Sequence, residues 1–305
     1  MQIFNEPFYP MDAECAVALG YFDGLHIGHS AVISAAHNYA KNKGIKTVVW
    51  TFENSPKSVF TTVKRITENK YKEKLFENLG TDTLYSFPFT EKIKELSCED
   101  FVKRVIVDTL KAKKVFCGFN YSFGAGGKGN PESLKNICSV HGVDVEILPA
   151  VLFENTPVSS TRVRECISEG DMDKAHALLG RFFSFSATVT DGNRIGRTIG
   201  FPTANTPIPK DMATPKNGVY LTRVHFNGQR LFGVTNVGLK PTVGSDKVSA
   251  ETHIFGFSGN LYGNELRIEF LYFLREERKF GSIDELKKQI EKDCAHAIKA
   301  AERYE

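Results

Sequence analysis

Two histidines stand three residues apart in a glycine-bearing turn near the start of the chain. The segment Gly20–His29 reads Gly-Tyr-Phe-Asp-Gly-Leu-His-Ile-Gly-His and lies between an apolar run at 15–19 and a stretch of helical spacing. A helix start offers N–H groups and a positive dipole end to phosphate, and two imidazoles can stabilise charge at a phosphorus. We infer catalytic roles for His26 and His29, with polar turn residues or an adventitious metal pair as the alternative. The candidate phosphate-binding residues around them are Gly20, Phe22, Asp23, Gly24 and Gly28.

A second cluster combines hydroxyl groups with arginines. The run Pro157–Arg164 reads Pro-Val-Ser-Ser-Thr-Arg-Val-Arg. Hydroxyls at a helix start accept hydrogen bonds from backbone N–H groups, and this capping role alone would explain them. The arginines close behind add cations where a triphosphate could lie. The candidate phosphate-binding residues here are Ser160, Thr161 and Arg164.

A third segment, Gly196–Asn205, reads Gly-Arg-Thr-Ile-Gly-Phe-Pro-Thr-Ala-Asn and leads from a loop into an extended stretch. Thr203 and Asn205 alternate by two, so both side chains can point to one face. A hydroxyl and an amide oxygen are hard ligands, suited to Mg²⁺ that carries ATP phosphates. A simple β-turn around the proline is the alternative. The candidate phosphate-loop residues are Gly196, Arg197 and Pro202.

Glu251 opens the strand-like run Glu-Thr-His ahead of Phe255. A carboxylate in this place can accept the proton of a primary hydroxyl as that hydroxyl attacks a γ-phosphoryl group. An isolated glutamate in a strand is usually only solvated, so this position alone leaves the role of Glu251 open.

The glycines of Gly124–Gly129 satisfy the pattern G-x-G-x-x-G ahead of a predicted helix. Such a pattern would favour a dinucleotide fold and a nicotinamide dehydrogenase. A dinucleotide fingerprint belongs in the first strand-to-helix turn, however, and this one comes far later in the chain. Its position therefore disfavours the dehydrogenase.

The pattern of predicted helices and strands that position these residues changes once along the chain, between residues 183 and 184. Strand and helix signals alternate through residues 1–183, with Gly44 placed to end the first helix and Asn130-Pro131 to start a later one. This alternation predicts a doubly wound parallel sheet, an α/β domain. Residues 184–305 show strands and tight turns, among them the hairpin signal Asn227-Gly228, and then a capping box at Ser282–Glu285. They predict an antiparallel sheet or β-barrel closed by a terminal helix.

Composition narrows the class of protein. The chain has 305 residues, of which 41% are hydrophobic and 25% charged, so it can bury a core. A net charge of +3 is mild and disfavours a general nucleic-acid or membrane-surface binder. No apolar run approaches the ~18 residues of a membrane span, which argues against a pump or channel, and we find no secretory signal. Six scattered cysteines without a C-x-x-C pair indicate reduced thiols and a cytoplasmic protein.

Over nearly its full length the chain resembles the prokaryotic bifunctional riboflavin kinase/FAD synthetase family. The histidine pair and Ser159–Arg164 are similar to the HxGH and SSTxxR signatures of nucleotidyltransferases, and Gly200–Asn205 and Glu251–His253 resemble the GFPTAN and ETH elements of riboflavin kinases. The resemblance implies a Rossmann-like FAD synthetase domain at 1–183 and a kinase barrel at 184–305. It also implies that Glu251 is the general base of the kinase and that Thr203 and Asn205 bind Mg²⁺ and phosphate.

The resemblance further implies where flavin binds. Gly118–Gly124 is similar to the synthetase segment near the flavin, which makes Asn120 a candidate, and Leu274–Phe280 resembles the kinase segment near the flavin, which makes Arg275 another. The implied small molecules are riboflavin, FMN and ATP, with FMN and FAD as substrate and product rather than prosthetic groups. We expect no nucleic-acid or membrane partner, and an oligomer stays open.

The chain departs from the family after the second predicted strand. Where the family usually has Pro-His-Pro, this chain has Asn54-Ser55-Pro56. The missing histidine leaves open a riboflavin kinase with an impaired adenylyltransferase domain. A flavin- or nucleotide-binding regulator without turnover is a further alternative.

Overall fold

The computed structural model of the chain describes residues 1–55, 63–191, 195–242 and 245–304. The chain divides into two compact units, Met1–Ser160 and Thr161–Glu305, and each is described by itself. The division falls earlier than the predicted boundary at 183, because α6 (Ser160–Glu169) and α7 (Met172–Leu179) group with the second unit. The domain boundary at 183 stays a prediction.

The first unit is built on a six-stranded parallel sheet, in the order β1-β4-β3-β2-β5-β6. The chain runs outward from β2 through β3 and β4, and then returns to the other side of β2 to form β5 and β6. The order therefore reverses between β2 and β5, and ligands bind at such switch points in open parallel sheets. The strands are β1 (Gln2–Phe4), β2 (Cys15–Leu19), β3 (Lys46–Phe52), β4 (Thr83–Phe87), β5 (Ala112–Gly118) and β6 (Asp144–Leu148).

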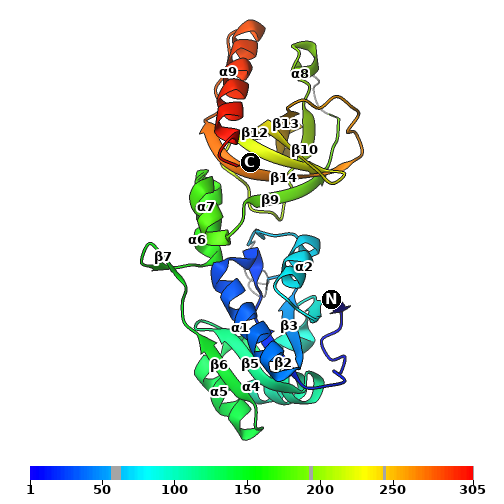
Figure 1. The fold of residues 1–305 in the computed structure, drawn as a ribbon, viewed down its shortest axis with the longest axis vertical. Helices are drawn as coiled ribbons and strands as arrows, with labels where there is room; N and C mark the ends of the chain where they lie inside the picture. Colours follow the sequence, from blue (N-terminus) through cyan, green and yellow to red (C-terminus); the bar gives the residue numbers. More distant parts are fainter. Residues whose placement is uncertain (56–62, 192–194, 243–244, 305) are drawn as a thin grey trace. The chain divides into compact units, whose positions relative to one another are not determined.

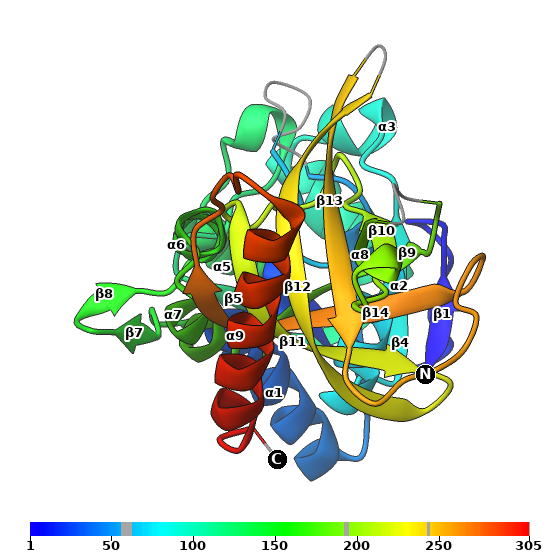
Figure 2. The same cartoon turned by 90° about the horizontal axis from the view of Figure 1, so that it is seen from above.

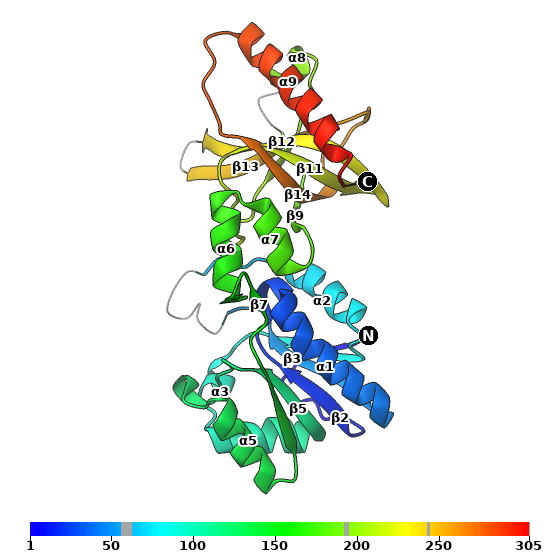
Figure 3. The same cartoon turned by 60° about the vertical axis from the view of Figure 1, so that its left-hand side comes forward.

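Helices cover both faces of this sheet, as the prediction of a doubly wound α/β domain requires (Figure 3). One face packs against α1 and α2, and the other packs against η3 and α5. The helical elements are η1 (Asp23–Leu25), α1 (Ile27–Lys43), α2 (Asn69–Asn78), α3 (Glu91–Lys94), α4 (Cys98–Asp100), η3 (Phe101–Thr109), η4 (Ala125–Gly127) and α5 (Pro131–Val140). A small hairpin follows, formed by β7 (Leu152–Phe153) and β8 (Thr156–Pro157).

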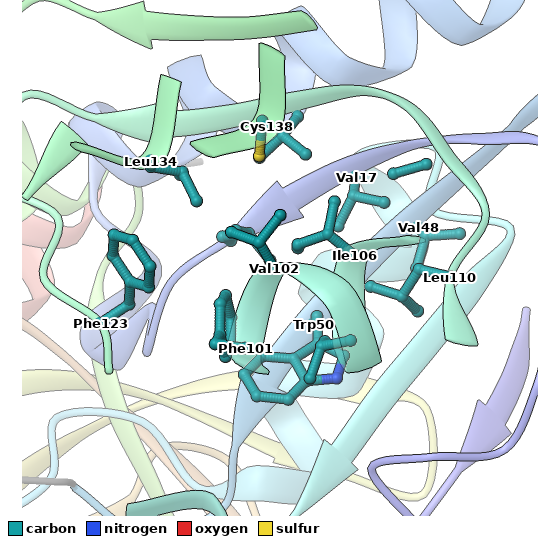
Figure 4. Close-up of a cluster of buried hydrophobic side chains, with 14 of the residues drawn as sticks. Val17, Val48, Trp50, Phe101, Val102, Ile106, Leu110, Phe123, Leu134 and Cys138 are labelled. Atoms are coloured by element: carbon teal, nitrogen blue, oxygen red, sulfur yellow. The ribbon is translucent and has the colours of Figure 1, made fainter. Parts of the chain in front are cut away.

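Aromatic side chains fill the core on the η3 face. Trp50 of β3 lies edge-on to Phe101 of η3, with ring centroids 5.4 Å apart (Figure 4). Trp50 makes a similar contact with Phe87. Trp50 is the only tryptophan of the chain. Its fluorescence therefore reports on the first unit alone.

Local signals in the sequence set several boundaries as predicted. Gly44 ends α1 with a φ of 66°, in the left-handed region that favours glycine. Asn130 caps α5 in a reciprocal capping box with Ser133, and the proline of the pair stands at the helix start. Asn227 and Gly228 both have positive φ in the hairpin between β11 (Gly218–Phe226) and β12 (Gln229–Thr242).

The helical segment that follows Ser97 changes its hydrogen-bond pattern after one turn. Ser97 caps α4 by accepting a bond from the Asp100 N–H. The next nine residues, Phe101–Thr109, form a π-helix. Such runs are rare and their apolar spacing is close to that of an α-helix, so the sequence pattern alone does not separate the two.

The second unit is a six-stranded antiparallel sheet in the order β10-β13-β12-β11-β14-β9. The long helix α9 (Ile283–Ala301) lies across β11 and β12 (Figures 1 and 2). There Cys294 and Ala297 pack on Val219 and Leu221. The remaining elements are β9 (Phe183–Thr188), α8 (Ile195–Thr198), β10 (Ala204–Pro207), β11 (Gly218–Phe226), β12 (Gln229–Thr242), β13 (Ser245–Ile254) and β14 (Glu265–Arg275).

The two edge strands of this sheet approach each other, which gives the sheet its barrel character. Thr190, just after β9, forms a β-bridge with Asn205 of β10. Inside the barrel, three buried threonines link neighbouring strands by their hydroxyls: Thr222 to Thr235 at 2.7 Å, and Thr235 to Thr252 at 2.8 Å. The predicted antiparallel barrel with a terminal helix is confirmed.

Crossing a membrane requires a helix that is both long and apolar, and none within the described ranges meets that requirement.

We expect Phe101→Ala to lower the free energy of unfolding of the first unit by about 3–5 kcal/mol, because it removes a buried ring from beside Trp50. Equilibrium denaturation followed by tryptophan fluorescence measures this change. Val140→Ala is the matched control: its side chain is 81% exposed, so its effect should stay within about 0.5 kcal/mol. Equal effects of the two substitutions would contradict the packing described above.

Candidate active sites

The turn between β2 and α1 has an unusual backbone. Phe22 and Leu25 have φ values of 53° and 40°, in the left-handed region that side chains other than glycine rarely adopt. Such conformations persist only where the surrounding structure holds them, and they cluster at functional sites. This turn stands at the carboxyl end of β2, beside the switch point of the sheet.

Hydrogen bonds from three other segments hold the turn. The Asp23 carboxylate accepts a bond from the Ile66 N–H at 3.0 Å, and the Asp23 carbonyl accepts one from the Ser160 hydroxyl at 2.8 Å. The Tyr21 carbonyl accepts a bond from the Thr51 hydroxyl at the end of β3. Asp23 is nearly fully buried, so in this structure its carboxylate fixes the turn from within.

The two histidines stack on each other at the start of α1. Their ring centroids are 3.6 Å apart and their planes differ by 15°. The Nδ1 atom of His26 accepts a hydrogen bond from the His29 N–H and caps the helix. In the neutral imidazole of His26 the proton is therefore on Nε2, which is the atom able to donate to a phosphate oxygen. The predicted histidine pair is thus brought together at the helix start.

The predicted glycines are required by close packing around the histidines. A Cβ on Gly20 would lie 2.7 Å from the Phe22 ring, and a Cβ on Gly28 would lie 3.2 Å from the His26 ring. Gly24 has a φ of 77°, and a Cβ there would come within 2.9 Å of the Ile66 side chain. Phe22 in turn contacts the edge of the His29 ring, at 5.3 Å between centroids. The tight turn thus supports the histidines.

The structure also places the other site candidates that the sequence predicts within residues 1–183. Ser160 joins the histidine turn through its bond to Asp23. Asn120 is exposed in the turn after β5, at the same edge of the sheet, because β2 and β5 are parallel neighbours. Thr161 and Arg164 lie on α6, which belongs to the second compact unit. Phosphate and flavin binding by these residues stay predictions.

In the second unit, strand register gathers polar residues in one row. Glu251 of β13 pairs with Asn205 of β10 on one side and with Asn236 of β12 on the other. Residues directly opposite each other in a sheet share a face, so the carboxylate and the two amides lie side by side. Asn236 Nδ2 also donates to the Glu277 carboxylate at 3.1 Å. The row therefore joins the predicted base Glu251 to the predicted ligand Asn205.

The segment before β10 packs against the same strand as Glu251. The His253 ring nitrogen Nδ1 lies 2.9 Å from the Pro202 carbonyl, and the His253 ring meets that of Phe201 edge-on. The Phe201 N–H donates to the Gly196 carbonyl at 2.7 Å, and Gly196 packs so closely on the Phe201 carbonyl that a Cβ would not fit. Arg197 belongs to α8, and its side chain lies outside the described residues.

The residues present fit a cation that arrives with a nucleotide. Thr203 is exposed and Asn205 follows two positions later on the same extended stretch, so both can offer hard oxygens beside the Glu251 carboxylate. The Asn205 amide nitrogen donates to Thr190 and to the Asp191 carbonyl, which orients the side chain. Among the described residues no three His, Cys, Asp or Glu side chains form a metal-binding group. This arrangement suits Mg²⁺ that substrate phosphates help to hold.

Arg275 makes contacts that its sequence position did not suggest. From the end of β14 it donates through Nε and Nη2 to both carboxylate oxygens of Asp293 on α9, at 2.7–3.1 Å. Its Nη1 atom donates to the Glu276 carbonyl. In this structure the guanidinium thus fastens α9 to the sheet, and its role in flavin binding stays a prediction.

Sequence reasoning missed Lys72 of α2. Its side chain is 3% exposed, and its ammonium reaches the carbonyls of Phe52 and Tyr21. Burial lowers the pKa of Lys72 to about 8. Its spacing from Phe76 could have identified it, because residues four apart share a helix face. A lysine on the same face as a buried aromatic ring is unusual.

Ser55, at the departure from the family pattern, is buried just beyond the end of β3. It therefore stands at the same sheet edge as the histidine turn. Its neighbour Asn54 accepts a bond from the Phe89 N–H.

Comparisons with known proteins cover both units. Residues 9–162 match the family described as FAD synthetase, and residues 179–301 match the family described as riboflavin kinase. A bifunctional riboflavin kinase/FMN adenylyltransferase from Listeria monocytogenes is 36% identical over 92% of this chain and 91% of that protein. One from Bacillus subtilis is 35% identical over 94% of this chain and 92% of that protein.

A solved structure is similar over the same length. The crystal structure of a protein from Streptococcus pneumoniae that is described as a macrolide-efflux protein has a TM-score of 0.89 to this chain at 30% identity. The similarity covers 96% of this chain and 97% of that one.

We expect Gly24→Ala to destabilise the first unit by about 2–5 kcal/mol, the sum of left-handed strain and overpacking against Ile66. Gly44→Ala is the matched control, since its φ is 66° but no atom lies within 4 Å of the added Cβ. It should cost only the strain, about 1–2 kcal/mol. Denaturation followed by Trp50 fluorescence compares the two, and a Gly44→Ala cost as large as that of Gly24→Ala would refute the packing argument.

Proposed function

Because the chain belongs to the family of bifunctional riboflavin kinases/FMN adenylyltransferases, we propose which of its residues carry each of the two reactions. The chain is an enzyme of FAD synthesis from riboflavin, with the kinase in the second matched segment and the adenylyltransferase in the first. The observation that supports the residue assignments is that each segment contains its own polar constellation: the stacked histidines at the switch point, and the Glu251 row in the barrel.

The kinase reaction moves the γ-phosphoryl group of ATP to the ribityl 5′-hydroxyl of riboflavin. Glu251 takes the hydroxyl proton as the oxygen attacks the γ-phosphorus, the bond to the β-phosphate oxygen breaks, and ADP leaves with FMN as the product. Thr203 and Asn205 would hold Mg²⁺ beside the phosphates, where the ion would neutralise the charge that develops. Gly196 and Arg197 of α8, together with Pro202, bind the phosphates.

The adenylyltransferase reaction joins AMP to FMN. An FMN phosphate oxygen attacks the α-phosphorus of a second ATP, the bond to the β-phosphate breaks, and pyrophosphate leaves. Because a phosphate monoester is largely ionised near neutral pH, the attack needs no base from the protein. His26 and His29 donate to the phosphate oxygens and stabilise the charge of the transition state. Backbone N–H groups of the turn and of the α1 start contribute to the same task.

The remaining candidate residues bind the nucleotide or the flavin. Ser160, Thr161 and Arg164 bind the triphosphate of the adenylyltransferase, Asn120 contacts its flavin, and Arg275 lies near the flavin of the kinase. We further propose that the protein works in the cytoplasm on small molecules, with no nucleic-acid or membrane partner. The thiol chemistry supports this, since all six cysteines lie in described residues and are free thiols.

Glu251→Gln should lower the kinase kcat by about 10²–10⁴-fold, because the amide cannot accept the hydroxyl proton. FAD formation from supplied FMN should be unchanged. Chromatography of flavins after incubation with riboflavin, ATP and Mg²⁺ measures the first rate, and incubation with FMN and ATP measures the second. Glu265→Gln, an exposed glutamate of β14, is the control. Unchanged phosphorylation by Glu251→Gln would remove the base from the proposal.

His26→Asn should have the opposite pattern. Asparagine keeps an oxygen that can cap α1, but it removes the imidazole, so FAD formation should fall at least ~10²-fold while riboflavin phosphorylation persists. The same two chromatographic assays measure both rates, with His141→Ala at an exposed site as the control. If the unaltered chain accumulates FMN and makes no FAD even from supplied FMN, the adenylyltransferase assignment fails and the kinase assignment stands.

A further inference from the structure

Lys72 combines deep burial with a charge, at the sheet edge where the histidines stand. Its side chain is 3% exposed, and its ammonium lies over the Tyr21 ring at 5.1 Å from the centroid. Taking an ammonium out of water is unfavourable, so buried lysines are uncommon unless the charge has a task. The contacts of this ammonium indicate what its charge does.

The ammonium connects the ends of two neighbouring strands. It donates to the Phe52 carbonyl at 2.9 Å, at the end of β3, and to the Tyr21 carbonyl at 3.4 Å, two residues beyond β2. Tyr21 directly precedes Phe22, the first residue with left-handed backbone in the histidine turn. Lys72 thus fixes the entry to that turn relative to β3.

The same face of α2 reaches the histidines through aromatic contacts. Phe76, four residues after Lys72, meets the Phe22 ring edge-on at 5.9 Å. The Phe22 ring meets the His29 ring at 5.3 Å, and His29 stacks on His26. A displacement of Tyr21 or Phe22 would therefore be transmitted to the imidazoles, and a misplacement of about 1 Å can cost a hundredfold in rate.

We propose that Lys72 is a positioning residue of the adenylyltransferase site, whose ammonium holds the β2–α1 turn so that His26 and His29 stand where the transition state forms. The inference rests on the proposed role of the histidines and adds to it a residue that touches no substrate. It also explains why a charge is kept where an apolar side chain would pack with less cost.

The protonation of Lys72 should make the rate of FAD formation depend on pH. Burial lowers the pKa of Lys72 to about 8, with Asp23 and Glu53 acting to raise it. The other charged or titratable groups that face the ammonium are Glu73, Arg65 and Tyr21. As the pH rises through about 8, Lys72 loses its proton, and the contact with the Tyr21 ring and both carbonyl bonds weaken. FAD formation should then decline with an apparent pKa near 8.

The test uses the full chain with Lys72→Met, which keeps a long side chain and removes the charge. Lys74→Met is the matched control, because Lys74 is exposed on the same helix. We expect Lys72→Met to lower the kcat of FAD formation from FMN and ATP at least tenfold, with both KM values within about twofold, as for an interaction needed only in the transition state. Its rate should lack the decline near pH 8, and riboflavin phosphorylation by the same preparation should be unchanged.

Trp50 fluorescence separates positioning from folding. Lys72→Met should unfold within a few degrees of the unaltered chain, since it removes a buried charge. A kcat equal to that of Lys74→Met would overturn the proposal, and so would a loss of FAD formation that accompanies a clearly lower unfolding temperature of the first unit. If the unaltered chain forms no FAD at all, the proposed adenylyltransferase site fails and the role of Lys72 fails with it.

Discussion

The left-handed backbone of Phe22 and Leu25 is unfavourable by itself, and the proposed adenylyltransferase site depends on the bonds that hold it. Asp23 supplies two of these bonds, one through its buried carboxylate to the Ile66 N–H and one through its carbonyl to the Ser160 hydroxyl. The donors come from segments about 40 and about 140 residues away in sequence. The turn therefore forms only in the folded unit, and its conformation sets the positions of the two histidines.

In the barrel, the strand register sets the positions of the polar side chains. A single alignment of β10, β13 and β12 places Asn205, Glu251 and Asn236 in one row, while Thr252, on the opposite face of β13, joins the buried hydroxyl chain with Thr235 and Thr222. A slip of one residue would turn Glu251 into the interior and expose the threonines. The hydroxyl chain therefore stabilises the register on which the proposed kinase site depends.

Each unit also contains a buried charged group that joins two of its elements. Lys72 joins two strand-end carbonyls in the first unit, and the Arg275–Asp293 pair joins β14 to α9 in the second, with Gln289 also donating to Asp293. Each ionic group costs solvation energy and is compensated by hydrogen bonds of fixed geometry. Such bonds add orientation as well as free energy, which is what sites for phosphoryl and adenylyl transfer require.

The sequence by itself determined the two classes of sheet, the caps at Gly44, Asn130 and Ser282, and the histidine pair, because these depend on residue types only a few positions apart. It also identified Glu251 and Asn205 separately, through motifs that resemble a known family. Only the tertiary structure decided that these two residues are cross-strand partners, that Phe101–Thr109 forms a π-helix, and that Lys72 and Arg275 are anchored by carbonyls and a carboxylate. These contacts join residues that are far apart in sequence. The periodicity of side chains along the chain predicts helices and strands, but it does not show which atoms come into contact.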